Sequence, residues 1–238
     1  MLEICAANLP SALAAQAAGA DRIELCCALD SGGLTPSFGL LRAVRRALSI
    51  PIYVLIRPRE GHFVFSQAEV ELMLDDIRHC RDAGADGVVF GALTPDGLPD
   101  LVALRAMAAT AKGMDTTFHR AFDFSADPFQ TLDLLADLGI GRVLSSGQAA
   151  TAFEGRFLLR KMVDHAAGRI RIMPGAGISA ANIAEIARST GAREFHLSAR
   201  KKIPAPAEIR QIPGLNAAIW VSDEQSIRET QAALRQVI

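Results

Sequence analysis

A repeated alternation of short apolar runs with longer amphipathic stretches constrains the fold of this chain more than any other feature. The apolar runs have the length of strands, and the stretches between them follow the roughly 3.6-residue period of helices. We expect strands at 2–6, 22–26, 52–57, 87–90, 116–119, 142–145, 170–173 and 194–197. We expect helices at 11–18, 37–48, 66–83, 100–111, 127–138, 153–166, 179–189 and 222–236.

The links that lead from helices into the following strands also repeat. They read GAD at 19–21, GAD at 84–86, GIG at 139–141 and GAR at 191–193. A glycine suits the left-handed cap of a helix, and so short a link suits a return to a parallel strand. The pattern predicts an α/β fold, a single-domain (β/α)8 TIM barrel over 1–238, with a doubly wound open sheet as the main alternative. Residues 198–220 carry three prolines and are expected to be an irregular loop before the last helix.

Composition narrows the class of protein further. Half of the residues are hydrophobic and 21% are charged, which supplies a large core and argues against disorder. A net charge of −1 without a basic block argues against nucleic-acid binding. No apolar run approaches the roughly 18 residues of a membrane span. The first residues lack the basic lead of a signal peptide, so the four cysteines are expected to be reduced thiols in the cytoplasm.

Side chains alternate along a strand, so each strand divides its residues between the helix layer and the barrel interior. Polar side chains take the inward positions and gather toward the carboxyl ends of the strands, where TIM barrels have their sites. The expected inward residues are Glu3 and Cys5, Glu24 and Cys26, Tyr53, Leu55 and Arg57, Thr117 and His119, and Glu194, His196 and Ser198.

Two of the four thiols are expected to meet inside the barrel. Cys5 and Cys26 lie on neighbouring strands at a similar height, and a thiol pair is a soft ligand set that suits Cu(I). No CxxC spacing supports a metal, and the alternative is that free cysteines simply fill the core. Cys27 is expected to face the helices or the loop, and Cys80 to pack on a helix.

Glu24 has two interpretations. It shares the interior with Arg57 of the adjacent strand, which predicts a buried ion pair. It is also a candidate general base, with His119 or His196 as the complementary acid. The alternative for each histidine is a structural role as a satisfied hydrogen-bonding group in the core.

Arginine is concentrated where lysine is scarce. Arg57 and Arg59 belong to RPREGHF (57–63) and Arg120 to TTFHRAFD (116–123), whereas the chain has four lysines in all. Guanidinium groups at a barrel mouth suit an anionic ligand, and the alternative is that they bridge loop carbonyls and carboxylates. No lysine falls near the carboxyl end of a strand, so a Schiff-base aldolase would lack its nucleophile.

Two glycine-containing loops resemble phosphate cradles. Ser146 and Gly147 belong to SSGQ (145–148), and Gly175 and Gly177 belong to PGAGI (174–178). Glycine permits close backbone approach to an anion, and phosphate sites of barrels commonly use the loops after strands 7 and 8. Ser198, just beyond the last strand, is a candidate for the same ligand.

Nine short segments together resemble the CutC family of copper-homeostasis proteins. In order they are LEICA, GADRIELC, GGLTPS, IRPR, GADGVVFGALTPDG, TFHRAFD, RVLSSG, MPGAGI and EFHLSAR, and the likeness ends near residue 200. The resemblance implies a TIM barrel, a homodimer, and copper handling in the cytoplasm. The copper-ligand cysteines proposed for the family match Cys5 and Cys26. The other expected function is an enzyme acting on a small anionic or phosphorylated metabolite, with Glu24, His119 and His196 as acid–base groups.

Overall fold

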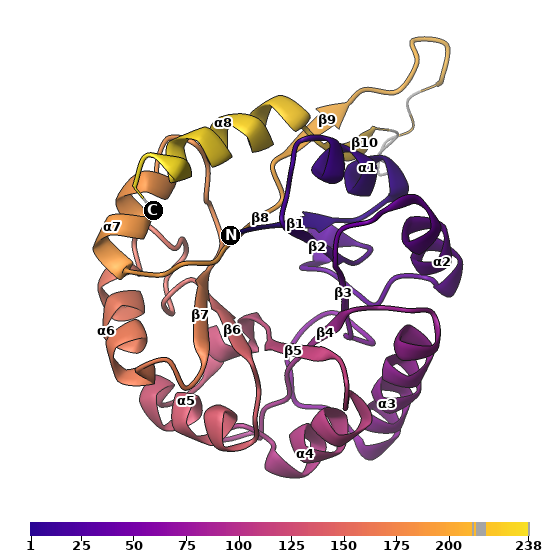
Figure 1. Ribbon diagram of the computed structural model, residues 1–238. Helices are drawn as coiled ribbons and strands as arrows, with labels where there is room; N and C mark the ends of the chain where they lie inside the picture. Colours follow the sequence, from indigo (N-terminus) through magenta and orange to yellow (C-terminus); the bar gives the residue numbers. More distant parts are fainter. Residues whose placement is uncertain (211, 213–217, 238) are drawn as a thin grey trace.

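The protein folds as a TIM barrel, as the alternating pattern predicts (Figure 1). The computed structural model describes residues 1–210, 212 and 218–237. Eight parallel strands follow the order β7-β6-β5-β4-β3-β2-β1-β8. A single bridge between Gly175 and His196 joins β7 to β8 and completes the ring. The open-sheet alternative is therefore wrong, because β1 pairs with β8 and β8 is bridged to β7, which closes the sheet.

The barrel strands are β1 (Leu2–Ala6), β2 (Arg22–Leu25), β3 (Ile52–Leu55), β4 (Gly87–Phe90), β5 (Asp115–Phe118), β6 (Arg142–Ser145), β7 (Arg171–Pro174) and β8 (Phe195–Leu197). The helices are α1 (Leu9–Ala17), α2 (Phe38–Ala47), α3 (Gln67–Asp82), α4 (Leu101–Thr110), α5 (Pro128–Asp137), α6 (Arg156–Ala166), α7 (Ile183–Thr190) and α8 (Glu224–Arg235). Two short 3-10 helices, η1 (Leu29–Ser31) and η2 (Arg120–Phe124), lie in the loops after β2 and β5. Strands β2 and β3 end earlier than expected, because their last residues leave the ladder for the barrel mouth.

Local signals explain where the helices begin and end. Ser66 accepts from the amide of Glu69, whose carboxylate reaches back to the amide of Ser66, so α3 begins with a capping box. The side chain of Asp127 caps α5, which has a proline in its first position. Gly191 ends α7 with φ of 72°, as its place before a short link predicts.

The main hydrophobic core lies between the strands and the surrounding ring of helices. A second apolar cluster lies inside the barrel and consists of Cys5, Cys26, Tyr53, Leu55 and Val89. Charged side chains, among them Glu3, Arg22, Arg142 and Glu194, also meet inside the barrel. No helix of the described residues combines the length and apolarity needed to cross a membrane.

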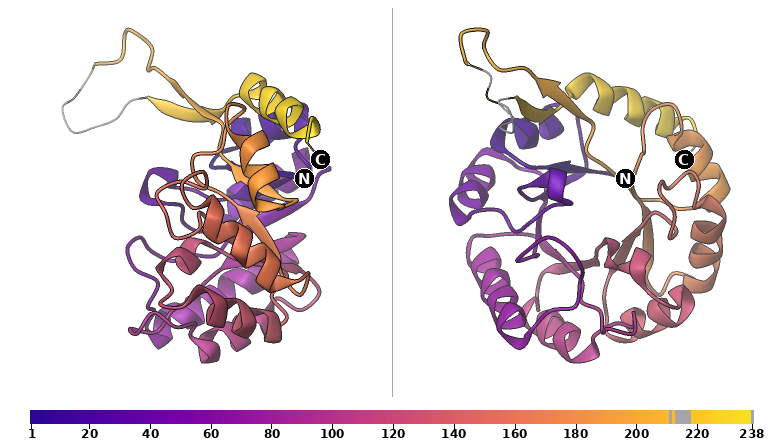
Figure 2. Two further views of the ribbon diagram at one scale, coloured as in Figure 1. Left: turned by 90° about the vertical axis from the view of Figure 1, so that its left-hand side faces the viewer. Right: turned by 180° about the vertical axis from the view of Figure 1, so that it is seen from behind.

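The segment after β8 is more regular than expected. Strands β9 (Arg200–Ile203) and β10 (Ile219–Ser222) pair antiparallel and form an arm beside α1 and α8 (Figure 2). The amide of Ser222 donates to the hydroxyl of Ser11 at 3.0 Å, which ties the arm to α1. The expectation of an irregular loop over 198–220 is wrong for these two strands, and 211 and 213–217 lie outside the described residues.

Candidate functional site

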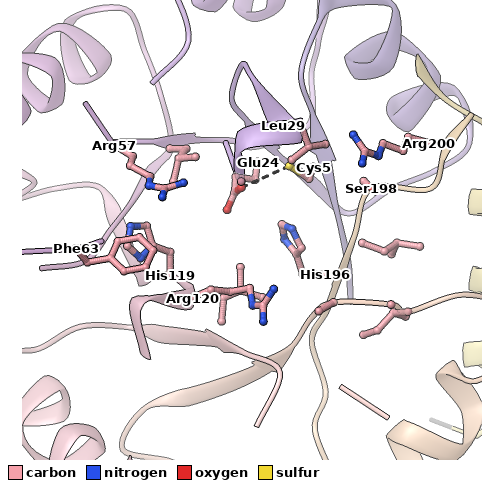
Figure 3. Close-up of a pocket in the computed structure, with 17 residues that line it drawn as sticks. Cys5, Glu24, Leu29, Arg57, Phe63, His119, Arg120, His196, Ser198 and Arg200 are labelled. Atoms are coloured by element: carbon pink, nitrogen blue, oxygen red, sulfur yellow. Dashed lines mark hydrogen bonds between the residues drawn. The ribbon is translucent and has the colours of Figure 1, made fainter. Parts of the chain in front are cut away.

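A cavity of about 350 Å³ opens at the carboxyl ends of the barrel strands (Figure 3). Eight of the predicted site residues line it: Cys5, Glu24, Arg57, His119, Arg120, Gly177, His196 and Ser198. Five others, Cys26, Arg59, Ser146, Gly147 and Gly175, lie outside this lining. The lining also includes residues that were not predicted from the sequence: Leu29, Phe63 and Ile178 from the loops, Leu144 of β6 and Arg200 of β9.

Cys5 lies at the floor of the cavity, where it contacts two neighbours from β2 and the residue after it. Its Sγ is 3.6 Å from the Sγ of Cys26 and 3.6 Å from Oε1 of Glu24. The strand register aligns Cys5 with Glu24, so Cys26 is the next residue above on the same face. The hydrogen bond with Cys26, together with burial, raises the pKa of the Cys5 thiol well above its ordinary value. Cys5 is therefore a neutral thiol in the metal-free protein.

The remaining two cysteines lie apart from this pair. Cys27 is half-buried in the loop, forms a bridge with Leu34 and donates its thiol to the carbonyl of Thr35 at 3.2 Å. Cys80 is buried on α3 as a packed side chain. Both placements agree with the expectation from the sequence.

A fully buried carboxylate holds His196 in position. Nδ1 of His196 lies 2.7 Å from Oε1 of Glu3, and Glu3 is also ion-paired with Arg22. Burial opposes the charge of Glu3, but the hydrogen bond from His196 and the charge of Arg22 lower its pKa to about 2. Nδ1 therefore donates to a fixed carboxylate, which leaves Nε2 for the cavity. Glu3 was expected inside the barrel but not as part of a site.

Cys5, Glu24 and His196 form a set of groups that could hold one metal ion. One ligand atom from each lies within 4.8 Å of the other two. A carboxylate on the far nitrogen of a histidine, as Glu3 provides here, is the usual support of a metal-bound imidazole. The thiols of Cys5 and Cys26 suit Cu(I), whereas the carboxylate of Glu24 suits a borderline divalent ion. The donor set fits a metal, and the thiol pair is the part that fits Cu(I).

The predicted ion pair between Glu24 and Arg57 is wrong. Arg57 donates instead to the carbonyl oxygens of Ser31 and Gly33, both at 3.1 Å, and of Gly61 at 2.8 Å. Arg57 lies two residues beyond the end of β3, where its side chain can turn toward the loops. Among the described residues no carboxylate pairs with this guanidinium group, although Arg57 is only 6% exposed.

Three buried polar atoms of the lining have no hydrogen-bond partner among the described residues. They are Oε2 of Glu24, Nε of Arg57 and Nε2 of His119. Each side chain is at most 6% exposed, so solvent does not replace the missing partners. Buried polar groups are nearly always hydrogen-bonded in folded proteins. Figure 3 shows these three side chains around one opening.

The tautomer of His119 follows from its contacts. Nδ1 accepts the amide hydrogen of Ala121 at 3.2 Å, so the ring proton of the neutral form is on Nε2. Burial and the charge of Arg57 lower the pKa of His119 to about 3. The ring is therefore neutral at ordinary pH and presents a hydrogen-bond donor. A Cβ at Gly91 would stand 2.6 Å from Nδ1, so only glycine leaves room for the ring there.

The loop after β6 forms part of the wall around Asp123. Asp123 accepts from Nε of Arg120 at 2.7 Å, from the hydroxyl of Ser145 at 2.6 Å and from the hydroxyl of Ser146 at 3.0 Å. Ser146 and Gly147 thus stabilise the loop rather than face the cavity. Asp123 was noted in the TTFHRAFD motif without a role, and its contacts show it to be the hub of this wall.

Arg59 has a similar structural role on the opposite side. It pairs with Glu69 and donates to the carbonyl oxygens of His62 and Val64, both at 2.8 Å. Arg200 is the reverse case, because the sequence analysis left it out although it lines the cavity. It lies beyond Ala199, whose φ of 43° breaks the strand alternation, so parity does not predict its place.

The fold and the site define a TIM-barrel protein with a polar cavity at the carboxyl ends of its strands. The model of the CutC family matches residues 1–201, and the chain belongs to this family. A protein named as family protein CutC, from Xanthomonas campestris pathovar campestris strain 8004, is 55% identical over 204 residues, which are 86% of this chain and 85% of that protein. Another of the same name, from Xanthomonas axonopodis pathovar citri strain 306, is 50% identical over 237 residues and 99% of each chain.

A solved structure extends the comparison to three dimensions. The chain resembles a candidate copper homeostasis protein CutC from Streptococcus agalactiae, with a TM-score of 0.80 and 33% sequence identity. The superposition covers 83% of this chain and 98% of the other. The structural similarity therefore extends over most of the chain.

Proposed function

We propose that the barrel mouth of this CutC-family protein binds a small anionic metabolite and acts on it by acid–base chemistry. The observation that carries this proposal is the buried guanidinium group of Arg57, which has no carboxylate partner among the described residues and one unbonded nitrogen at the cavity. A buried charge is costly unless it is paired. An anionic ligand would supply the missing partner.

Glu24 and His119 supply complementary chemistry beside that anion. Burial raises the pKa of Glu24, despite the opposing charge of His196, toward the range in which a carboxylate is an effective base. Nε2 of His119 carries a proton that it donates to no described group, so it can polarise an oxygen of the ligand. This combination suits the transfer of a proton from carbon beside a carbonyl group. Glu3 holds His196 in position beside Glu24. The charge of His196 favours the ionised form of the Glu24 carboxylate.

A thermal-shift screen of small organic acids and phosphate esters tests the binding step. A ligand present at 100 times its Kd stabilises the folded state by about 2.7 kcal/mol, which is a rise in Tm of roughly 5–10 °C for a chain of this size. Arg57→Lys should weaken the binding at least tenfold, because a lysine loses the fork-like contacts of the guanidinium group.

Arg59→Lys is the matched control for that substitution. Arg59 also holds loop carbonyls but lies outside the cavity lining, so its replacement should leave ligand affinity unchanged. Equal loss of affinity in both variants, or a screen without any hit, would contradict the proposal. Glu24→Gln separates chemistry from binding, since it should retain the ligand and lose proton exchange at the ligand carbon.

Copper homeostasis is the second candidate function, and the 3.6 Å contact between the thiols of Cys5 and Cys26 favours it. The Streptococcus agalactiae relative is described as a candidate copper homeostasis protein. In this proposal Cys5 and Cys26 hold one Cu(I) ion, with His196 beside them as a third donor. Reduced thiols require a reducing compartment, which the cytoplasm provides. The homodimer expected for the family stays a prediction.

Competition between the reduced protein and a Cu(I) chelator tests this candidate. The double variant Cys5→Ser/Cys26→Ser should lose at least a hundredfold in Cu(I) affinity. Cys27→Ser is the matched control, because Cys27 is adjacent in sequence but its thiol contacts the loop instead of the pair. If the double variant and the control bind Cu(I) as tightly as the wild type, these thiols are not the ligands.

A further inference from the structure

The loops after β7 and β8 present hydrogen-bond donors that no described group satisfies. Gly177 and Ile178 line the cavity, and the structure records no acceptor for either amide hydrogen. The neighbouring groups of the loop are engaged, since the amide of Ser179 donates to Asn182 and the carbonyl of Gly177 accepts from Asn182. Gly177 and Ile178 thus offer amide donors on the part of the loop that lines the cavity.

Ser198 adds to this group from the neighbouring strand end. It lies two residues beyond His196 on the same face, and Gly175 at the start of the β7 loop is bridged to His196. Neither the amide nor the hydroxyl of Ser198 has a hydrogen-bond partner among the described residues. The donors of the two loops thus line the same cavity as His196.

The balance of donors and acceptors limits what can fill the cavity. Unused donors come from Arg57, His119, Gly177, Ile178 and Ser198. The unused acceptor among the buried side chains of the lining is Oε2 of Glu24. The lining therefore suits a ligand with acceptor oxygens at two places, near Arg57 just after β3 and near the loops of β7 and β8 on the opposite side of the barrel.

We propose that the ligand of this cavity carries two anionic groups, a phosphate held by the amides of Gly177 and Ile178 and by Ser198, and a second acidic group held by Arg57. The inference rests on the proposed function, and it narrows the substrate class to small phosphorylated organic acids or bisphosphates. A phosphate offers enough lone pairs for several amide donors at once. The carbon chain between the two groups then lies beside Glu24, His119 and His196.

Calorimetric titration with three probes tests the two-ended arrangement. Phosphoglycolate carries both groups, glycerol 3-phosphate carries the phosphate alone, and glycolate carries the carboxylate alone. Phosphoglycolate should bind at least tenfold more tightly than either single-ended probe. Ser198→Asp places a negative charge in the phosphate subsite and should weaken both phosphate probes at least tenfold while leaving glycolate unchanged.

Ser49→Asp is the matched control, because it adds the same charge at an exposed position in the link between α2 and β3. If phosphoglycolate binds no better than glycolate, or if the two aspartate variants behave alike, the phosphate subsite is overturned. The proposed function survives that result when glycolate binding still depends on Arg57. Absence of binding by all three probes would overturn both the subsite and the anion site.

Discussion

Both ends of the barrel interior carry charged side chains, but at the amino ends of the strands these side chains pair with one another. At the amino ends of the strands, Arg22 and Arg142 share the carboxylate of Glu194, and Arg22 also pairs with Glu3. Arg171 approaches Glu194 from the rim at 3.2 Å. At the carboxyl ends, Glu24, Arg57 and His119 each keep an unpartnered buried atom.

This difference separates the structural part of the interior from the functional part. The amino-end network (Glu3, Arg22, Arg142, Glu194) satisfies its own charges, so it needs nothing from outside. The mouth instead keeps buried polar atoms without partners among the described residues, which a ligand would satisfy under the proposed function. Glu3 connects the two regions, because it pairs with Arg22 on one side and holds His196 on the other. In TIM barrels the amino face is associated with stability and the carboxyl face with activity.

Removal of Arg22 should give the largest loss of stability. Arg22→Met leaves Glu3 and Glu194 as buried carboxylates with one partner fewer, and breaking a buried ion pair typically costs about 3–5 kcal/mol. Urea denaturation of the variant should show this decrease in the free energy of unfolding. Arg169→Met is the control, since Arg169 pairs with Asp133 at the surface and its loss should cost less than about 1 kcal/mol.

A loss below 1 kcal/mol for Arg22→Met would contradict the closed-network interpretation. It would mean that the amino-end carboxylates find water or other partners when the guanidinium group is gone. The two ends of the barrel would then differ less than their contacts indicate.

The second effect is a dependence of stability on pH that comes from His119. In the unfolded chain its pKa is about 6.5, and in the folded protein burial and Arg57 lower it to about 3. Between these values the unfolded state binds a proton that the folded state does not, so stability falls as the pH falls. The slope is about 1.4 kcal/mol per pH unit, or about 2 kcal/mol between pH 6.5 and 5.

His119→Asn isolates this contribution. The amide oxygen of asparagine can accept the hydrogen of the Ala121 amide, but the side chain does not titrate. Urea denaturation at several pH values should give a flatter profile for the variant between pH 6.5 and 5. Identical slopes would show that His119 takes up its proton in the folded protein, and that the mouth is wetter than its burial implies.

The sequence predicts the barrel because the fold depends on local, repeated patterns. The eight apolar runs mark the eight strands, and glycines such as Gly191 mark the return from helix to strand. Parity also places Glu24 and Cys5 on the inner face, since alternation holds while the residues stay in the ladder. Parity no longer predicts the direction of a side chain where the strand ladder ends. Arg57 lies beyond β3 and donates to loop carbonyl oxygens instead of pairing with Glu24.

The loops explain what else the sequence does not predict. Phe63 and Ile178 line the cavity because their connections fold over the mouth, and no periodic pattern predicts that. Ser146 looks like a phosphate ligand from its glycine-containing motif, yet Asp123 takes its hydroxyl from a different loop. The pairing of β9 with β10 depends on residues far apart in sequence, so proline content alone suggested a loop.

The smallest predicted effect on stability is that of Glu24→Gln. The same substitution can be made at Glu194, so the two ends of the barrel can be compared directly. Glu194→Gln removes the charge that Arg22 and Arg142 share and should cost about 3 kcal/mol. Glu24→Gln removes a carboxylate with a raised pKa, one oxygen of which has no partner, and should change the free energy of unfolding by less than about 1 kcal/mol.

The pH dependence of the same pair of variants carries opposite signs. The pKa of Glu24 is raised in the folded protein. The stability that protonated Glu24 confers is therefore present below its unfolded pKa and is lost as the pH rises through its folded pKa. Glu24→Gln should flatten the stability profile on the alkaline side. The pKa of Glu194 is lowered, since its arginine partners outweigh burial, so Glu194→Gln should flatten the profile on the acid side instead. Urea denaturation across pH 3–8 measures both. Equal losses in the free energy of unfolding and equal pH profiles would mean that Glu24 is paired as fully as Glu194. That result would contradict the interpretation that the barrel mouth binds a ligand.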